Sequence, residues 1–182
     1  MCKKLFVISG PSGTGIGEVL RAVFAQRPDV TAVTPVTARK MKPGEQDGVG
    51  YYFYDLDGWN ALKESGDLLE ATEFAGNDYG TSRALVEAAL AQGRHVLLSL
   101  SVERAAQIKA HMPQAVCVYM EPSLPALEER IRARSRSDLE VRVRLEEAQR
   151  QRALAAFCDA RISTDDPGAA VQALCALMDR ED

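Results

Sequence analysis

Short apolar runs alternate with helical patterns along most of the chain, and this alternation restricts the fold to one class. The apolar runs typical of buried strands lie at 4–9, 94–100, 115–120 and 160–164. The helical patterns lie at 16–26, 82–92, 102–111, 123–134, 137–157 and 167–180. Ser137 with Glu140 forms a capping-box pattern, and Asp166 before Pro167 is typical of a helix start. Strands joined by helices of about ten residues predict an α/β fold, a parallel sheet with helices on both faces.

The segment 35–80 interrupts the alternation. It contains Pro35, Pro43, several glycines and the aromatic run YYFYD at 51–55. We expect a small β-rich lobe here, inserted between core segments 1–34 and 81–182. A chain of 182 residues is near the size of one domain, so core and lobe are predicted to form a single unit.

Composition excludes several classes of partner. A net charge of -4 argues against nucleic acid and anionic membrane as partners, because both select basic surfaces. No apolar run approaches the roughly 18 residues of a membrane span, and the N-terminus reads as a first strand instead of a signal peptide. The four cysteines are scattered and there are two histidines, which predicts reduced thiols, no metal site and a cytoplasmic protein. The oligomeric state stays open.

The stretch LFVISGPSGTGIGEVL, residues 5–20, has the form of a phosphate-binding loop between a strand and a helix. Glycines allow backbone N–H groups to converge on phosphate oxygens, and the helix N-terminus adds partial positive charge. The candidate nucleotide-binding residues are Gly10, Ser12, Gly13, Thr14, Gly15, Ile16 and Gly17. Ile16 stands where the motif has its lysine, so a plain glycine-rich turn remains an alternative.

Four segments in order resemble guanylate kinases: VISGPSGTG, VTARKMKPGEQDGVGYYF, LLEATEFAGNDYGTS and ALEERIRARSRSDLEVRVRLEEA. The resemblance runs from about residue 4 to the end of the chain. It implies the P-loop nucleoside-monophosphate-kinase fold, with a GMP-binding lobe at 35–80 and a mobile lid at about 134–140.

The resemblance also implies an acceptor site. By it, Arg39, Tyr51 and Tyr79 hold the GMP phosphate, Glu70 accepts the guanine N1–H and amino protons, and Thr81 reaches the guanine oxygen. Lys42 replaces a second phosphate-binding arginine, and Pro35 replaces a serine that contacts guanine. Taken singly, the tyrosines are also compatible with core positions, and Glu70 with a solvated charge.

The ATP side departs from the family pattern. Ile16 removes the lysine that spans the β- and γ-phosphates. The family strand ending D-x-D, which supplies carboxylates near magnesium and GMP, ends here in Ser99 and Ser101. Glu103 is displaced from those places and is a poor substitute. Because phosphoryl transfer depends on positioning and charge, these changes predict strongly impaired catalysis.

Eight arginines lie within 130–152. By the resemblance, Arg132, Arg134 and Arg144 match lid arginines that bracket the transferred phosphate, which makes them the candidate catalytic residues. The alternative is a solvated helix face, paired with the glutamates of the same segment.

Three functions follow as hypotheses. The first is a guanylate-kinase-like protein that binds GMP or a similar guanine nucleotide and has lost most phosphoryl transfer, and that needs no cofactor. The second is an active kinase that converts GMP and ATP to GDP and ADP with Mg-ATP. The third is an interaction domain of the phosphopeptide-binding type.

Overall fold

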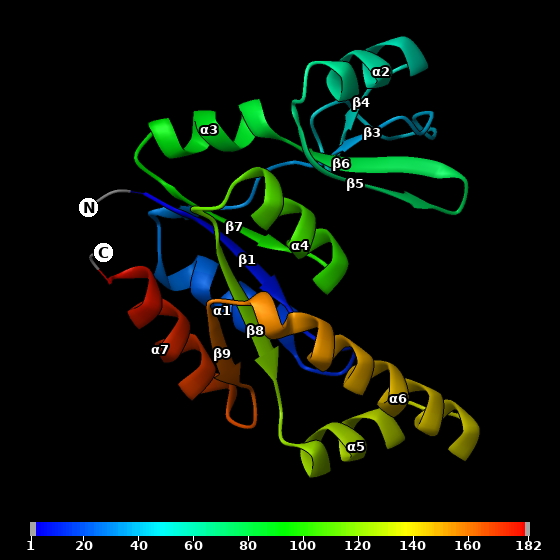
Figure 1. Ribbon diagram of the computed structural model, residues 1–182, viewed down its shortest axis with the longest axis vertical. Coiled ribbons are helices and arrows are strands. Elements are labelled where there is room, and N and C mark those ends of the chain that lie inside the picture. The colour runs from blue at the N-terminus through cyan, green and yellow to red at the C-terminus, as the bar shows by residue number, and fades with distance from the viewer. Residues whose placement is uncertain (1–2, 181–182) are drawn as a thin grey trace.

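The computed structural model describes residues 3–180 and contains two sheets (Figure 1). The large sheet has five strands in the order β2-β7-β1-β8-β9, and all of its pairings are parallel. Its strands are β1 (Leu5–Ser9), β2 (Val30–Thr31), β7 (His95–Ser99), β8 (Val116–Glu121) and β9 (Ala160–Ser163). The helices are α1 (Ile16–Gln26), α2 (Leu56–Glu64), α3 (Arg83–Ala91), α4 (Val102–His111), α5 (Leu124–Arg132), α6 (Asp138–Leu154) and α7 (Pro167–Met178).

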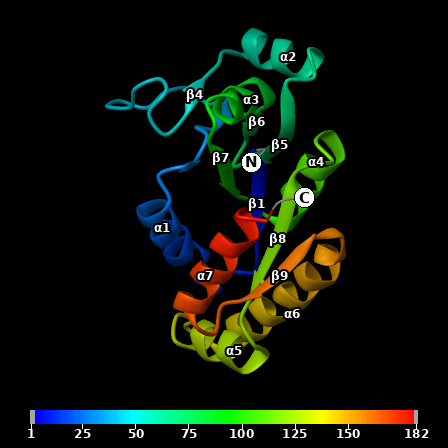
Figure 2. The same cartoon turned by 90° about the vertical axis from the view of Figure 1, so that its left-hand side faces the viewer.

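Both faces of the large sheet are covered, as the alternation of strands and helices predicts. Successive side chains of β1 point to opposite faces. Phe6 and Ile8 join the core that packs against α1 and α7, whereas Leu5 and Val7 join the core on the side of α3 and α4. Figure 2 shows α1 and α7 on one side of β1 and β8, with α4 and α6 on the other.

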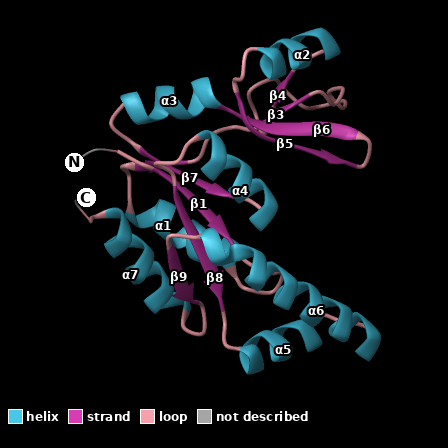
Figure 3. Cartoon of the chain, viewed as in Figure 1, coloured by secondary structure: helices cyan, strands magenta, loops and turns pink. Residues whose placement is uncertain are grey.

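The second sheet forms a separate layer above the first, as the strand colouring of Figure 3 shows. Its strand order is β4-β3-β6-β5, and it combines parallel and antiparallel pairs. The strands are β3 (Val36–Thr37), β4 (Tyr52–Phe53), β5 (Leu68–Phe74) and β6 (Asn77–Ser82). The sequence predicts a β-rich lobe at 35–80, and the structure adds helix α2 to this segment. Asp55 caps α2 by accepting the Gly58 N–H, and Trp59 is buried.

The predicted helix starts are confirmed in detail, with one difference. Ser137 accepts the Glu140 N–H, and Asp166 accepts the N–H groups of Gly168 and Ala169. The Glu140 carboxylate accepts from the Arg136 N–H, where a capping box would have it accept from Ser137. Helix α6 ends at Leu154 and continues as a single 3-10 turn to Phe157.

Two further features of the described residues concern helix hydrophobicity and the cysteines. Between residues 3 and 180 no helix has the length and apolar character that a membrane crossing requires. Cys117, Cys158 and Cys175 are free thiols, whereas Cys2 lies outside the described residues. Burial raises the pKa of Cys117 to about 12.

The stability of the fold is expected to depend on pH through His95, the first residue of β7, which is buried. Its Nδ1 accepts the Lys4 backbone N–H at 3.2 Å, and among the described residues Nε2 has no partner. Burial lowers the pKa of His95 below its ordinary 6.5. The unfolded chain therefore binds a proton first as the pH falls, so stability is full above about 6.5 and declines below it.

The substitution His95→Gln is expected to flatten this decline. Urea unfolding at about pH 5.5 and about pH 7.5 gives the difference in free energy of unfolding between the two conditions. That difference should be smaller in the variant than in the parent chain. Equal differences would contradict a buried, neutral His95.

Candidate functional site

The glycine-rich loop joins β1 to α1 at the carboxyl edge of the large sheet, where ligands bind in open α/β sheets. Gly13 and Gly15 have φ of 93° and 85°, a conformation that side chains disfavour. Gly10 permits a close approach instead, because a Cβ there would lie 2.2 Å from the Met120 carbonyl oxygen. The Glu18 N–H donates to the Gly15 carbonyl at 3.0 Å, whereas the N–H groups of Ile16 and Gly17 precede the first hydrogen bond of α1 and are open to an anion.

The side chains of the loop contribute little charge or hydroxyl chemistry. Thr14 is buried and donates its hydroxyl to the Pro11 carbonyl. Ile16 packs against the core beneath α1, and its Cδ1 lies 3.1 Å from where a Gly10 Cβ would be. The loop therefore offers a backbone cradle for phosphate, without the side-chain cation that would bridge two phosphates.

Ser99 and Ser101 lie at the end of β7, beside the loop. Ser99 is in register with Ile8 of β1, and Ser101 is the N-cap of α4. Glu103 points to another partner, since its carboxylate accepts from Arg150 of α6 at 2.7 Å. No group of three or more histidine, cysteine, aspartate or glutamate side chains that could hold a metal occurs within residues 3–180. The side chains present here do not fit Mg-ATP, because the described residues offer neither a carboxylate for the metal nor a cation for the phosphates at this strand end.

The predicted phosphate-binding residues come together between β3, β4 and β6. The Tyr51 and Tyr79 rings are 5.5 Å apart, and the Arg39 guanidinium lies 5.7 Å from the centre of the Tyr51 ring. Glu45 holds Arg39 with two hydrogen bonds of 2.8 and 3.0 Å. This contact is the main cause that lowers the pKa of Glu45 to about 2. Lys42 is exposed, and its backbone N–H also donates to Glu45.

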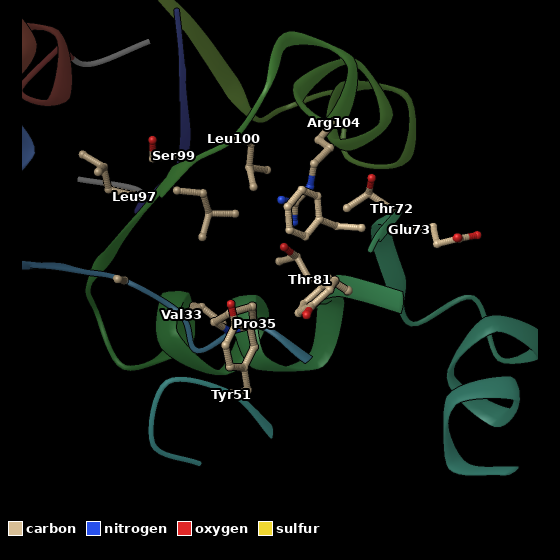
Figure 4. A pocket seen from close by; sticks show the side chains of 14 residues that line it. Val33, Pro35, Tyr51, Thr72, Glu73, Thr81, Leu97, Ser99, Leu100 and Arg104 are labelled. Carbon is tan, nitrogen blue, oxygen red and sulfur yellow. The ribbon is translucent and has the colours of Figure 1, made fainter. Parts of the chain in front are cut away.

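A cavity of about 560 Å³ opens between the two sheets (Figure 4). Tyr51, Tyr79 and Thr81 line it from the small sheet, and Ser99 and Leu100 line it from the end of β7. Arg104 of α4 reaches into it from the far side. The cavity thus joins the tyrosines of the phosphate cluster to the end of β7.

Glu70 lies behind this cavity and is fully paired. It is 1% exposed, which rules out a solvated charge. Arg104 donates to both of its oxygens, at 2.5 and 2.7 Å, and Thr81 donates its hydroxyl at 2.7 Å. The two predicted partners of guanine are therefore hydrogen-bonded to each other, and Glu70 also accepts hydrogen bonds from Arg104.

Of the predicted lid arginines, Arg132 is the last residue of α5, Arg134 lies in the connection to α6, and Arg144 lies in the second turn of α6. Arg132 pairs with Glu128 and Asp138, and Arg144 pairs with Glu140, as the solvated-face alternative predicts. Arg134 is exposed and has no ion pair among the described residues. The mobility of the lid at 134–140 and the catalytic role of these arginines remain predictions.

Sequence reasoning missed two arginines. Arg104 lies in the first turn of α4, and only its position just after a strand end indicated a place at the site. Arg130 of α5 donates to the Thr14 carbonyl at 3.2 Å and to the Thr164 carbonyl at 2.8 Å, which ties the glycine loop to the end of β9. Neither contact follows from a local motif.

A parallel sheet whose first strand enters a glycine-rich loop and helix, with a second sheet over its carboxyl edge, defines the P-loop nucleoside-monophosphate-kinase fold. The sequence model of the family described as guanylate kinase matches residues 2–181. The chain belongs to the guanylate kinase family.

Individual relatives agree with this assignment. A guanylate kinase of Trichormus variabilis is 37% identical over 173 residues, 94% of this chain and 87% of the relative. One from Synechococcus sp. (strain CC9902) is 42% identical over 132 residues, 72% of this chain and 71% of the relative. The crystal structure of guanylate kinase from Anaplasma phagocytophilum matches the fold with a TM-score of 0.65 at 23% identity, and covers 97% of this chain and 85% of that one.

Proposed function

We propose that the chain binds a purine nucleoside monophosphate, GMP or a close relative of it, and that its phosphoryl transfer is strongly impaired. The observation that carries the proposal is an asymmetry between two halves of one site. Arg39, Tyr51 and Tyr79, the residues expected to hold the phosphate, lie together beside a cavity large enough for a base. On the donor side, Ile16 packs into the core and Ser101 caps a helix.

The chemistry explains why this asymmetry matters. Binding a monophosphate needs a guanidinium fork and hydroxyl donors, and the cluster supplies both. Transferring a phosphoryl group needs charge aimed at the transferring oxygens and a held magnesium ion. Loss of one such preorganised donor costs roughly 100- to 1,000-fold in rate. With the lysine and both carboxylates replaced, the expected turnover is very low.

Membership of the guanylate kinase family favours one alternative, an active enzyme that converts GMP and ATP to GDP and ADP. Under it, the loop amides and Arg132, Arg134 and Arg144 would compensate for Ile16. Its observable consequence is ADP and GDP formation above background.

Calorimetric titration of GMP, and separately of Mg-ATP, tests the proposal. We expect saturable binding of GMP, no saturable binding of Mg-ATP, and turnover at background. The matched variant Arg39→Gln removes the guanidinium fork and should weaken GMP at least about tenfold. Binding of both nucleotides with measurable turnover would favour the active enzyme, and binding of neither would leave only the fold.

A further inference from the structure

The guanidinium of Arg104 forms the wall of the cavity nearest α4, and the carboxylate of Glu70 lies behind it. Arg104 lines the cavity and its side chain is 24% exposed, whereas Glu70 is absent from the described lining and its side chain is 0% exposed. A ligand that enters between the two sheets therefore meets Arg104 first. Figure 4 shows the Arg104 side chain reaching into the cavity.

Arg104 uses the two-oxygen edge of Glu70 that a guanine would need. Its Nε donates to one carboxylate oxygen at 2.5 Å and its Nη2 donates to the other at 2.7 Å. Guanine offers a similar pair of parallel donors, the N1–H and the 2-amino group. Thr81 adds a further hydrogen bond to one of the oxygens. A guanine that approaches this edge must displace a bidentate, charge-assisted contact.

We propose that Arg104 determines which base the cavity prefers. Its guanidinium presents hydrogen-bond donors to the ligand, where the Glu70 carboxylate alone would present acceptors. The ligand class this favours is a purine nucleoside monophosphate with an oxygen at the 2-position, of the xanthine type, over guanine with its 2-amino group. The inference rests on the proposed function, because the phosphate cluster must hold the monophosphate in either case.

The donors needed for this role remain available on Arg104. A guanidinium carries five N–H groups, and the contacts with Glu70 use one on Nε and one on Nη2. Within residues 3–180, Nη1 has no hydrogen-bond partner. An acceptor oxygen on a base would pair with these groups, whereas an amino group would place donor against donor.

The other polar groups around the cavity do not reverse this preference. Thr72 and Ser99 carry hydroxyls, which donate or accept as the ligand requires. Glu73 also lines the cavity, but its side chain is exposed near the end of the β5–β6 hairpin and remains hydrated. Among these groups Arg104 is the one that can only donate hydrogen bonds, and it is more buried than Glu73.

XMP and GMP test the proposal, because xanthine has an oxygen at the 2-position where guanine has an amino group. The rings also differ at N3, which carries a proton or a negative charge in xanthine and is a bare acceptor in guanine, so the comparison of the parent chain with the Arg104 variants carries the test. For the parent chain, calorimetric titration should give XMP at least about tenfold tighter binding than GMP. In Arg104→Ala the Glu70 oxygens face the cavity, and the order should invert, with GMP the tighter ligand. GMP should then also raise the melting temperature of the variant more than that of the parent chain, because it gives Glu70 a new partner.

Two further variants keep the test decisive. Arg150→Ala removes the same charge from the exposed pair with Glu103, outside the cavity, and should leave the ratio of XMP to GMP affinity unchanged. Should Arg104→Ala fail to fold, Arg104→Gln leaves one donor for Glu70 and should still shift the ratio toward GMP.

The outcomes separate this inference from the function on which it rests. Nucleotide binding with equal affinities, or with GMP tighter in the parent chain, overturns the role of Arg104 and leaves the monophosphate site intact. An unchanged ratio in the Arg104 variants does the same. No binding of either nucleotide to any of the proteins overturns the monophosphate site and this inference together.

Discussion

The triple variant Ile16→Lys, Ser99→Asp and Ser101→Asp should form ADP from a purine monophosphate and Mg-ATP at least about 100-fold faster than the parent chain. The lysine returns a cation to the glycine loop, and the aspartates return carboxylates to the strand end beside it. Both aspartate positions suit the fold, because Ser99 is exposed and Asp replaces Ser well as the N-cap of α4. The measurement is steady-state ADP release with GMP and with XMP as acceptors.

Each single change should give much less than the triple variant, since residues that act as a unit have strongly non-additive effects on rate. The matched control places methionine at position 16 together with both aspartates. Methionine has nearly the length of lysine without its charge, so this control separates charge from shape. A parent chain that already turns over as fast as the triple variant would contradict the impaired-enzyme proposal.

Adding one methyl group at Gly10 should be the most destabilising small change in the loop. Gly10→Ala places a Cβ 2.2 Å from the Met120 carbonyl oxygen, and a backbone atom of β8 cannot rotate away. Overpacking of this kind usually costs about 1–3 kcal/mol, and we expect the upper end or more because the neighbour is main chain. Urea unfolding gives the free energy of unfolding directly.

Gly17→Ala is the matched control for Gly10→Ala. Gly17 lies in the first turn of α1, is exposed, and would have no atom within 4 Å of an added Cβ. Alanine is favoured over glycine in a helix by roughly 0.5–1 kcal/mol, so this variant should be as stable as the parent chain or slightly more stable. Similar losses for both variants would refute a steric role specific to Gly10.

The sequence predicts the layers of this fold because their causes are local. The apolar run at 94–100 becomes β7, and the caps at Ser137 and Asp166 begin α6 and α7. Helix α2 was missed inside the predicted β-rich lobe. Its own signals are present, since Asp55 caps it and Trp59 forms its buried side.

The site is less accessible to such reasoning because its decisive contacts are long-range. The resemblance directs attention to Glu70, Arg39 and Tyr79, and the structure places the last two beside Tyr51, while their roles remain predictions. The partner of Glu70 is Arg104, 34 residues away on another element, and no spacing rule connects them. The direction of the Ile16 side chain likewise depends on packing beneath α1, which a motif does not encode.

Both arginines at the acceptor site are already matched to internal carboxylates, Arg39 to Glu45 and Arg104 to Glu70. Under the proposed function, a phosphate that binds here takes the place of Glu45 as the counter-ion of Arg39, and the exposed Lys42 adds a positive charge that no ion pair among the described residues matches. The two internal carboxylates thus hold both guanidinium groups in place before a ligand binds, and a ligand that uses either arginine has to share it with Glu45 or Glu70.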